Sequence, residues 1–212
     1  MLGGRLAPLR LLGVDSGALR WPMLAIEVGD LTIRPPQMDD FAAWSTLRAQ
    51  SRDFLAPWEP LWPEDDLTRP SFRRRIRRYQ SEIDSDEAYP FFVFRTADMM
   101  LLGGLTLGNV RRGAAQSASL GYWMGENFAG QGIMGHSVAA VCRLGFNKLR
   151  LERIEAACLE ENAASTRLLE KAGFQREGLA RSYLNIAGRR RDHLLFALLS
   201  SDGRLLRDQN QR

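Results

Sequence analysis

The chain has 212 residues, of which 45% are hydrophobic and 25% charged, and this size fits one domain with or without a short appendage. The composition excludes wholesale disorder, a collagen-like repeat and a disulfide scaffold, and no apolar run reaches the about 20 residues of a membrane-spanning helix. A net charge of +4 fits an anionic ligand or partner. Cys142 and Cys158 lie in apolar sequence and are expected to be reduced packing residues of a cytoplasmic protein. With only two histidines, no metal site is expected.

Residues 1–25 are predicted to form a loosely ordered N-terminal extension. Arginines stand there among apolar residues, but Asp15 interrupts the stretch, so the apolar core of a signal peptide is missing. The native start of the chain is either Met1 or Met23.

The first predicted strand is Leu31–Arg34, where apolar and polar side chains alternate before two prolines. A helix capped by Asp39 or Asp40 follows, because apolar residues recur after this point at helical spacing. Residues 56–63 contain three prolines, which argue against a regular element, and two tryptophans. This Pro/Trp loop is predicted either to plug the core or to form the wall of a binding groove.

A helix over residues 72–80 carries five arginines, within the segment Arg73–Arg78. Arginine stems can lie on a core while their charged ends stay in water, so a solvated helix face is the first interpretation. The alternative is a docking surface for nucleic acid or for an acidic partner.

The rest of the chain is predicted to hold three strands, a helix, a strand, a helix and two closing strands. Short connections make the first three strands antiparallel. Gly173 is predicted to end the second helix, and Ala187-Gly188 to form the final turn. This order predicts an α/β fold with a mixed sheet and helices on both faces. The predicted strands are 91–95, 101–109, 117–124, 153–159, 174–183 and 190–199, and the helices are about 132–148 and 163–172.

A glycine-rich turn connects the strand that ends at Met124 to the next helix. Gly130 and Gly132 let the backbone turn sharply, and the first amides of the helix have no intrahelical partners. With the helix dipole, such amides can hold a diphosphate without a lysine. The letters also match the dinucleotide fingerprint G-x-G-x-x-G, but the preceding strand belongs to an antiparallel meander rather than to a βαβ unit.

Asn162 follows the strand that ends near Leu159 and precedes a short helix. It is well placed as the N-cap of that helix. The alternative is that its side-chain amide faces a cleft beside the glycine-rich turn.

Seven short motifs carry a family resemblance when they are taken in order. They are Leu31-Thr32-Ile33-Arg34-Pro35, Leu120-Gly121-Tyr122-Trp123, Gln131-Gly132-Ile133-Met134, Arg153-Ile154-Glu155-Ala156, Asn162-Ala163-Ala164-Ser165, Gly173-Phe174-Gln175-Arg176-Glu177-Gly178 and Arg191-Asp192-His193. Together they resemble the GNAT superfamily of acetyl-CoA-dependent N-acetyltransferases. Within it, the chain is most similar to the group that acetylates N-terminal alanine or serine of ribosomal proteins.

The resemblance implies a GNAT-like acyl-CoA N-acyltransferase fold with a central splayed mixed sheet. The N-acetyltransferase domain then covers residues 26–200, with a polar C-terminal tail over 201–212. It further implies acetyl-CoA as cosubstrate, with its pantetheine arm between the strand ending near Trp123 and the strand Arg153–Leu159. The implied cofactor-binding residues are Tyr122, Trp123, Met124, Gly130, Gln131, Gly132, Ile133, Met134, Asn162 and Ser165.

Two positions depart from the family pattern. Ala129 stands where the superfamily usually has Gln or Arg, which matters little if backbone amides bind the phosphates. Leu169 stands where many members carry a tyrosine acid, so Ser165 is the expected proton donor to the thiolate.

The general base is left open among several groups. Glu126, Glu160 and a water chain are candidates, and Tyr183 is either a proton-relay member or a residue at the core edge. Asp192 and His193 are adjacent on one strand and should point to opposite faces, so a triad is not expected.

The expected reaction moves an acetyl group from acetyl-CoA to an amine. An α-amine has a pKa of about 7.7–8.0 against about 10.4 for lysine, so a site without a strong base favours a protein N-terminus. The alternatives are an acetyltransferase for a small amine (a polyamine, an antibiotic or an amino acid) and, ranked last, a ribosome- or RNA-binding module. Nucleic acid is otherwise expected only through proximity to the ribosome, and the chain is expected to be a monomer or a homodimer.

Overall fold

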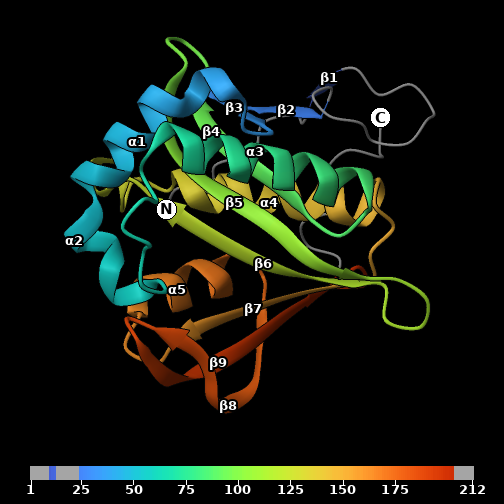
Figure 1. The fold of residues 1–212 in the computed structure, drawn as a ribbon. Coiled ribbons are helices and arrows are strands. Elements are labelled where there is room, and N and C mark those ends of the chain that lie inside the picture. Colours follow the sequence, from blue (N-terminus) through green and yellow to red (C-terminus); the bar gives the residue numbers. More distant parts are fainter. Residues whose placement is uncertain (1–9, 13–23, 203–212) are drawn as a thin grey trace.

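A computed structural model describes residues 10–12 and 24–202 of the chain. Its strands form a single sheet in the order β1-β2-β3-β4-β5-β6-β7-β9-β8 (Figure 1). All neighbouring strands are antiparallel except β6 and β7, which makes the sheet mixed, as predicted. The strands are β1 (Arg10–Leu12), β2 (Ala25–Val28), β3 (Leu31–Arg34), β4 (Tyr89–Arg95), β5 (Met100–Arg111), β6 (Ser117–Met124), β7 (Arg153–Leu159), β8 (Gln175–Ile186) and β9 (Arg189–Leu199).

Two strands were not predicted. Arg10–Leu12 lie within the expected N-terminal extension and pair with β2, while the rest of residues 1–23 lies outside the described residues. Strand β2 pairs with β3 through the two-residue turn Gly29-Asp30, in which Gly29 has a φ of 59°. A Gly-Asp pair between alternating apolar residues is a hairpin signal, so β2 could have been predicted.

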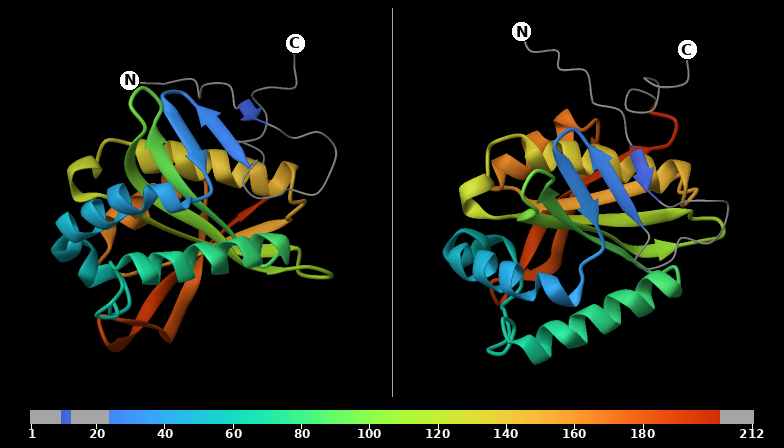
Figure 2. Two further views of the ribbon diagram at one scale, coloured as in Figure 1. Left: turned by 45° about the horizontal axis from the view of Figure 1, so that its top comes forward. Right: turned by 90° about the horizontal axis from the view of Figure 1, so that it is seen from above.

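Helices cover both faces of the sheet, as the views in Figure 2 show. On one face, Trp44 and Leu47 of α1 and Phe72 of α3 pack against strands β4 and β5. On the other face, α4 and α5 pack into a larger apolar cluster that includes Val138 and Leu169. The helices are α1 (Phe41–Gln50), α2 (Arg52–Leu55), α3 (Arg69–Asp84), α4 (Ile133–Asn147) and α5 (Ala163–Lys171). Within residues 10–12 and 24–202, no helix is both long and apolar enough to cross a membrane.

Two local expectations need correction. Asp40 is the N-cap residue of α1, but its carboxylate does not cap that helix; it binds Arg34 at 2.7 and 2.8 Å and accepts the Gln37 N–H at 2.7 Å. The Pro/Trp loop is also not free of regular structure, because Ala56–Trp58 form a 3-10 turn. Proline fits in the first turn of a helix, where its missing N–H would have had no partner.

Strand β6 has two different halves. Its paired half, Ser117–Leu120, is hydrogen-bonded to β5 on one side and lies in parallel register with Arg153–Ala156 of β7 on the other. Its open half, Gly121–Met124, keeps only β5, because the pairing with β7 ends at Leu120 and Ala156, while β7 stays paired with β9 along its whole length. The sheet therefore splays between β6 and β7, as expected from the sequence.

Candidate active site

The open half of β6 supplies hydrogen-bonding backbone on the side from which β7 has separated. Successive N–H groups of a strand point to its two sides, and only the β5 side is paired here. The burial follows the pairing, because the paired half is mostly buried and the open half is exposed or half-buried. This edge can accept an extended ligand in the way that a sheet accepts another strand.

The glycine-rich turn continues from this strand into α4. Gly130 and Gly132 have φ angles of 75° and 80°, a conformation that only glycine adopts without strain. No side chain caps the helix, and the first backbone bond into its N-terminus is made by the N–H of His136. The amides from Ile133 to Gly135 therefore precede the intrahelical ladder and are free to bind an anion.

The space over this turn is open. A Cβ atom added at Gly130, Gly132 or Gly135 would meet no atom within 4 Å. A phosphate can therefore approach the backbone closely, and the turn has the geometry of an anion site.

Helix α5 begins on the β7 side of the gap between β6 and β7. The side-chain oxygen of Asn162 accepts the N–H of Ser165 at 3.0 Å, which confirms the predicted N-cap. The Ser165 hydroxyl lies 2.6 Å from the hydroxyl of Tyr122, a residue of the open half of β6. Leu169 is fully buried, so the core occupies the position at which many family members are expected to carry a tyrosine.

The Tyr122 hydroxyl is held in its protonated form. Burial raises the pKa of Tyr122 to about 12, and its hydrogen bond with Ser165 opposes this only in part. Either hydroxyl can donate the hydrogen bond in this pair, and a protonated Tyr122 can donate it to Ser165. The Ser165 hydroxyl hydrogen is then free to point into the gap between β6 and β7. This coupling was not predicted, because it joins two elements through residues 43 positions apart.

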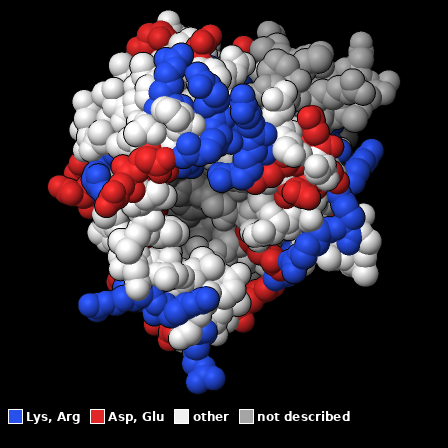
Figure 3. Space-filling model, in the orientation of Figure 1, with Lys and Arg blue, Asp and Glu red and all other residues white. Residues whose placement is uncertain are grey.

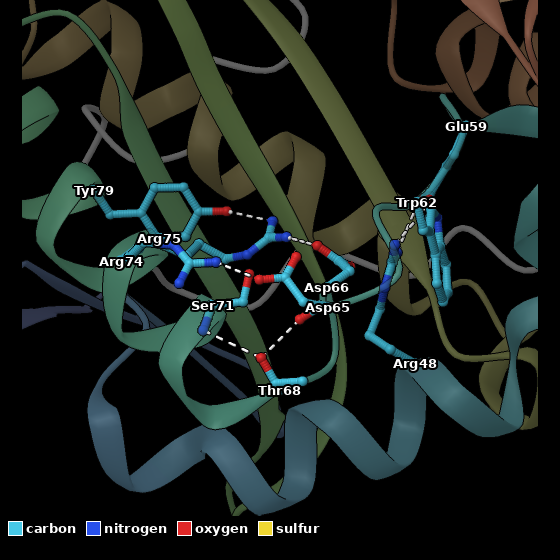
Figure 4. Close-up of polar contacts among 10 residues, drawn as sticks. All are labelled: Arg48, Glu59, Trp62, Asp65, Asp66, Thr68, Ser71, Arg74, Arg75 and Tyr79. Atoms are coloured by element: carbon cyan, nitrogen blue, oxygen red, sulfur yellow. Dashed lines mark hydrogen bonds and ion pairs between the residues drawn. The ribbon is translucent and has the colours of Figure 1, made fainter.

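A cluster around Arg48 fixes the Pro/Trp loop beside the open half of β6 (Figure 4). The guanidinium of Arg48 donates to both carboxylate oxygens of Glu59, at 2.7 and 2.6 Å, and the Trp62 indole donates to the same carboxylate at 2.7 Å. The Arg48 guanidinium lies 4.0 Å from the ring centre of Trp62 and 4.9 Å from that of Trp123. These contacts join α1, the loop and β6 into one wall.

Strand β5 makes room for Trp123 in this wall. A Cβ atom at Gly104 would lie 2.7 Å from the Trp123 indole nitrogen, and one at Gly103 would lie 2.5 Å from the Trp123 carbonyl oxygen. The Gly103-Gly104 pair therefore has a packing role, since any side chain there would displace the tryptophan.

The Pro/Trp loop also reaches the turn between β8 and β9. The Ala187 N–H donates to the Glu59 carbonyl at 2.9 Å, and Leu61 lies against Gly188. The face in Figure 3 is hollowed at its centre, between the α3 region above and the β8–β9 region below. Of the two predicted roles of the loop, the wall of a groove fits this arrangement.

The predicted base candidates lie at the surface. Glu126 is exposed on a 3-10 turn after β6, where its N–H binds the Ser51 hydroxyl at 3.0 Å, and Glu160 is exposed at the end of β7. Tyr183 is 44% exposed and stacks edge-on against the buried His193, with ring centres 5.7 Å apart. Among the described residues, neither the Glu126 nor the Glu160 carboxylate is hydrogen-bonded to Tyr122 or Ser165, so the catalytic roles of both stay predictions.

Asp192 and His193 point apart, as expected. The Asp192 carboxylate accepts the N–H of Ser182 at 2.7 Å and holds that residue at a φ of 49°, whereas the His193 ring contacts the Arg191 carbonyl at 3.0 Å. Within the described ranges, no group of three or more potential metal ligands gathers.

The splayed sheet, the uncapped helix after the glycine turn and the hydroxyl pair define the acyl-CoA-binding class of transferase. The acetyltransferase (GNAT) domain family matches residues 30–175, and the chain belongs to this family. The protein is therefore an N-acetyltransferase that uses acetyl-CoA, which confirms the activity and the cosubstrate expected from the sequence.

Similar proteins extend over most of the chain. A probable N-acetyltransferase, YjcK of Bacillus subtilis, is 37% identical over 80% of this chain and 94% of its own length. The [ribosomal protein uS5]-alanine N-acetyltransferase of Escherichia coli is 31% identical over 85% of this chain and 93% of its own. The structure of Mycobacterium smegmatis RimJ in complex with CoA-disulfide is 34% identical, has a TM-score of 0.78 and covers 84% of each chain.

Proposed function

We propose that the protein acetylates the N-terminal α-amine of a protein that begins with alanine or serine, such as a ribosomal protein. The observation that carries this proposal is a site with the Tyr122–Ser165 hydroxyl pair and free backbone amides, in which no described carboxylate is hydrogen-bonded to either hydroxyl. The buried carboxylates Asp40 and Asp66 are instead paired with Arg34 and Arg75. A site without a strong base suits an amine that is already partly neutral near pH 7. The similarity to a uS5-alanine N-acetyltransferase along most of both chains supports the same acceptor class.

The glycine-rich turn would bind the diphosphate of acetyl-CoA. The amides from Gly130 to Met134 donate to the phosphate oxygens, and the uncapped end of α4 adds its dipole. The open half of β6 hydrogen-bonds the pantetheine arm like an added strand. The arm then brings the thioester to the level of Tyr122, Asn162 and Ser165.

The transfer itself needs an oxyanion donor and an acid. The neutral amine attacks the thioester carbonyl, and a free N–H near Trp123 donates to the oxygen that becomes negative. As the C–S bond breaks, Ser165 gives its proton to the leaving sulfur and takes one from Tyr122, which water reprotonates. The proton lost by the amine passes to water, with Glu126 or Tyr183 as predicted relays.

The second candidate acceptor is a small amine. The bridge between the Pro/Trp loop and Ala187 limits one end of the hollow, and a smaller site would favour such a molecule. However, the face in Figure 3 is hollowed at its centre and the hollow opens toward the viewer, which favours an extended peptide.

The decisive experiment offers all acceptors to one enzyme preparation. The purified full chain is incubated with labelled acetyl-CoA and peptides that begin with Ala, Ser or Met, beside free lysine and a polyamine. We expect label on the Ala and Ser peptides, and none on the same peptides with a blocked N-terminus. Faster labelling of lysine or the polyamine would replace the proposal by the small-amine alternative.

A further inference from the structure

Helix α3 presents arginines over its outward side, while Phe72 and Ile76 on its inward side are buried against the sheet. In Figure 3 the basic side chains of this region gather above the central hollow. We call their exposed members the arginine face: Arg69, Arg73, Arg74, Arg77 and Arg78.

The charge of the whole chain is concentrated in this helix. Residues 69–84 contain six arginines and two acidic residues, which gives a net charge of +4. The complete chain also has a net charge of +4, so all other residues together are electrically balanced. A local excess of this kind attracts polyanions and is the electrostatic footprint of a nucleic-acid contact.

Helix stability does not explain this arrangement. The positive end of a helix dipole is the N-terminus, where acidic residues are favourable, yet the first turn has none and begins with Arg69. Glu82 and Asp84 lie in the last turn, where basic residues would be favourable and none is present. The charges at both ends are therefore opposite to those that stabilise a helix.

Only some of the arginines of α3 form ion pairs. Arg74 and Arg75 bind Asp65 and Asp66 just before the helix, as Figure 4 shows, and these contacts hold the helix start in place. Arg78 has one ion pair, with Glu82 at 3.4 Å, and its guanidinium lies 5.4 Å from the ring centre of Tyr79. Within residues 10–12 and 24–202, Arg73 and Arg77 form no ion pair.

The exposed side of α3 has no apolar residue of the kind that a protein partner would bury, and this favours a nucleic acid over an acidic protein. A protein interface has an apolar centre, but no large exposed hydrophobic residue lies on α3 in the described part of the chain. A phosphate backbone needs only positive charge at its contacts. From Arg69 to Arg78 the helix rises about 14 Å, which is long enough to meet several phosphates in a row.

We propose that the arginine face binds the phosphate backbone of a nucleic acid without reading its sequence. This surface is separate from the acetyl-CoA site and does not depend on which amine is the acceptor. Its guanidinium groups form paired hydrogen bonds with phosphate oxygens, a geometry that suits arginine better than lysine.

The test measures binding of the full chain to labelled probes by fluorescence anisotropy. The probes are an RNA hairpin, a DNA duplex of the same length and polyglutamate, each titrated between about 50 and 200 mM salt. We expect either nucleic acid to bind more tightly than polyglutamate, with steep salt dependence, and the tighter of the two identifies the source of the phosphates. Polyglutamate binding as tight as both nucleic acids, or no nucleic-acid binding at low salt, would overturn the proposal.

A charge-matched pair of variants locates the contact. Arg73→Glu/Arg77→Glu should weaken nucleic-acid binding at least tenfold and reduce the slope of log K against log salt by about 1.8 for a duplex. Arg150→Glu/Arg176→Glu changes the net charge equally at exposed positions outside α3 and should weaken binding far less. Equal losses in the two variants would refute a site on α3. Thermal melting and acetyl-CoA binding, expected to be unchanged, report that both variants are folded.

Discussion

The two halves of β6 belong to one strand of eight residues but have different environments. The paired half is hydrogen-bonded on both sides and mostly buried, and Leu120 is only 5% exposed. The open half has the same partner in β5 but has lost β7, and its residues are half-buried or exposed. The difference shows that hydrogen-bonding main-chain groups can be left free along a strand without a special set of side chains. Four predictions test this division.

The largest effect is expected where the open half leads into α4. Gly132→Pro cannot adopt the φ of 80°, since proline is fixed near −65°, and it also removes a backbone donor. We expect loss of measurable CoA binding by calorimetry. Gly113→Pro is the matched control, because Gly113 also has a positive φ, 64°, but lies in the β5–β6 loop. Unchanged CoA affinity in Gly132→Pro would place the phosphates elsewhere.

The next effect concerns the hydroxyl pair across the splay. Ser165→Ala removes the proposed proton donor and should lower kcat about 100-fold or more, which is the range of acid catalysis. The KM for acetyl-CoA should change little, because the proposed phosphate contacts are made by α4 rather than by Ser165. Ser165→Thr keeps the hydroxyl and should restore part of the rate. An Ala variant with the full rate would exclude Ser165 as the acid.

A substitution in the paired half should lower the stability of the protein and leave its affinity for CoA unchanged. Leu120→Ala removes a buried side chain and should lower the free energy of unfolding by about 2–5 kcal/mol, measured by urea denaturation. The affinity for CoA below the unfolding transition should stay as in the parent chain. A large loss of affinity at unchanged stability would contradict the separation of the two halves.

The smallest expected effect is a pH dependence of protein stability that is caused by the raised pKa of Tyr122. Burial raises its pKa to about 12, whereas a tyrosine of the unfolded chain ionises near about 10. The unfolded state therefore loses its proton first as the pH rises, and up to about 3 kcal/mol of stability disappears between pH 10 and 12. The stability contributed by this group is fully present below pH 10.

Tyr122→Phe should flatten this alkaline loss of stability. Urea unfolding at several pH values measures it, with Tyr183→Phe as control, because Tyr183 is 44% exposed. The buried Tyr89, whose pKa is also raised, chiefly by burial, contributes in the same direction and stays in both variants. Identical pH curves for the parent chain and Tyr122→Phe would show that the Tyr122 hydroxyl is not desolvated.

Strong local patterns made much of the fold predictable. The bounds of β3, β6 and β7 agree with the sequence prediction, because alternating residues and turn signals mark their ends. The N-cap role of Asn162 and the turn at Ala187-Gly188 were likewise predictable, since each depends on residues next to one another.

Other features depend on elements that meet only in the folded chain. Arg48 follows a helical pattern in the sequence, and nothing near it in the chain indicates that its charge is buried between Trp62 and Trp123. The bond between Tyr122 and Ser165 likewise needs the separation of β6 from β7 to be known first. Asp39 or Asp40 was predicted to cap α1, but no side chain caps that helix, and the Asp40 carboxylate binds Arg34 of β3.

The contact between the Pro/Trp loop and the β8–β9 turn is made by the main chain, with the Ala187 N–H on one side and the Glu59 carbonyl on the other. Every residue type except proline can supply that N–H, and every residue type can supply that carbonyl. Under the proposed function, substitutions along either segment can therefore alter which amines are accepted while this main-chain contact is kept. Acceptor preference is for this reason free to diverge among descendants of one scaffold.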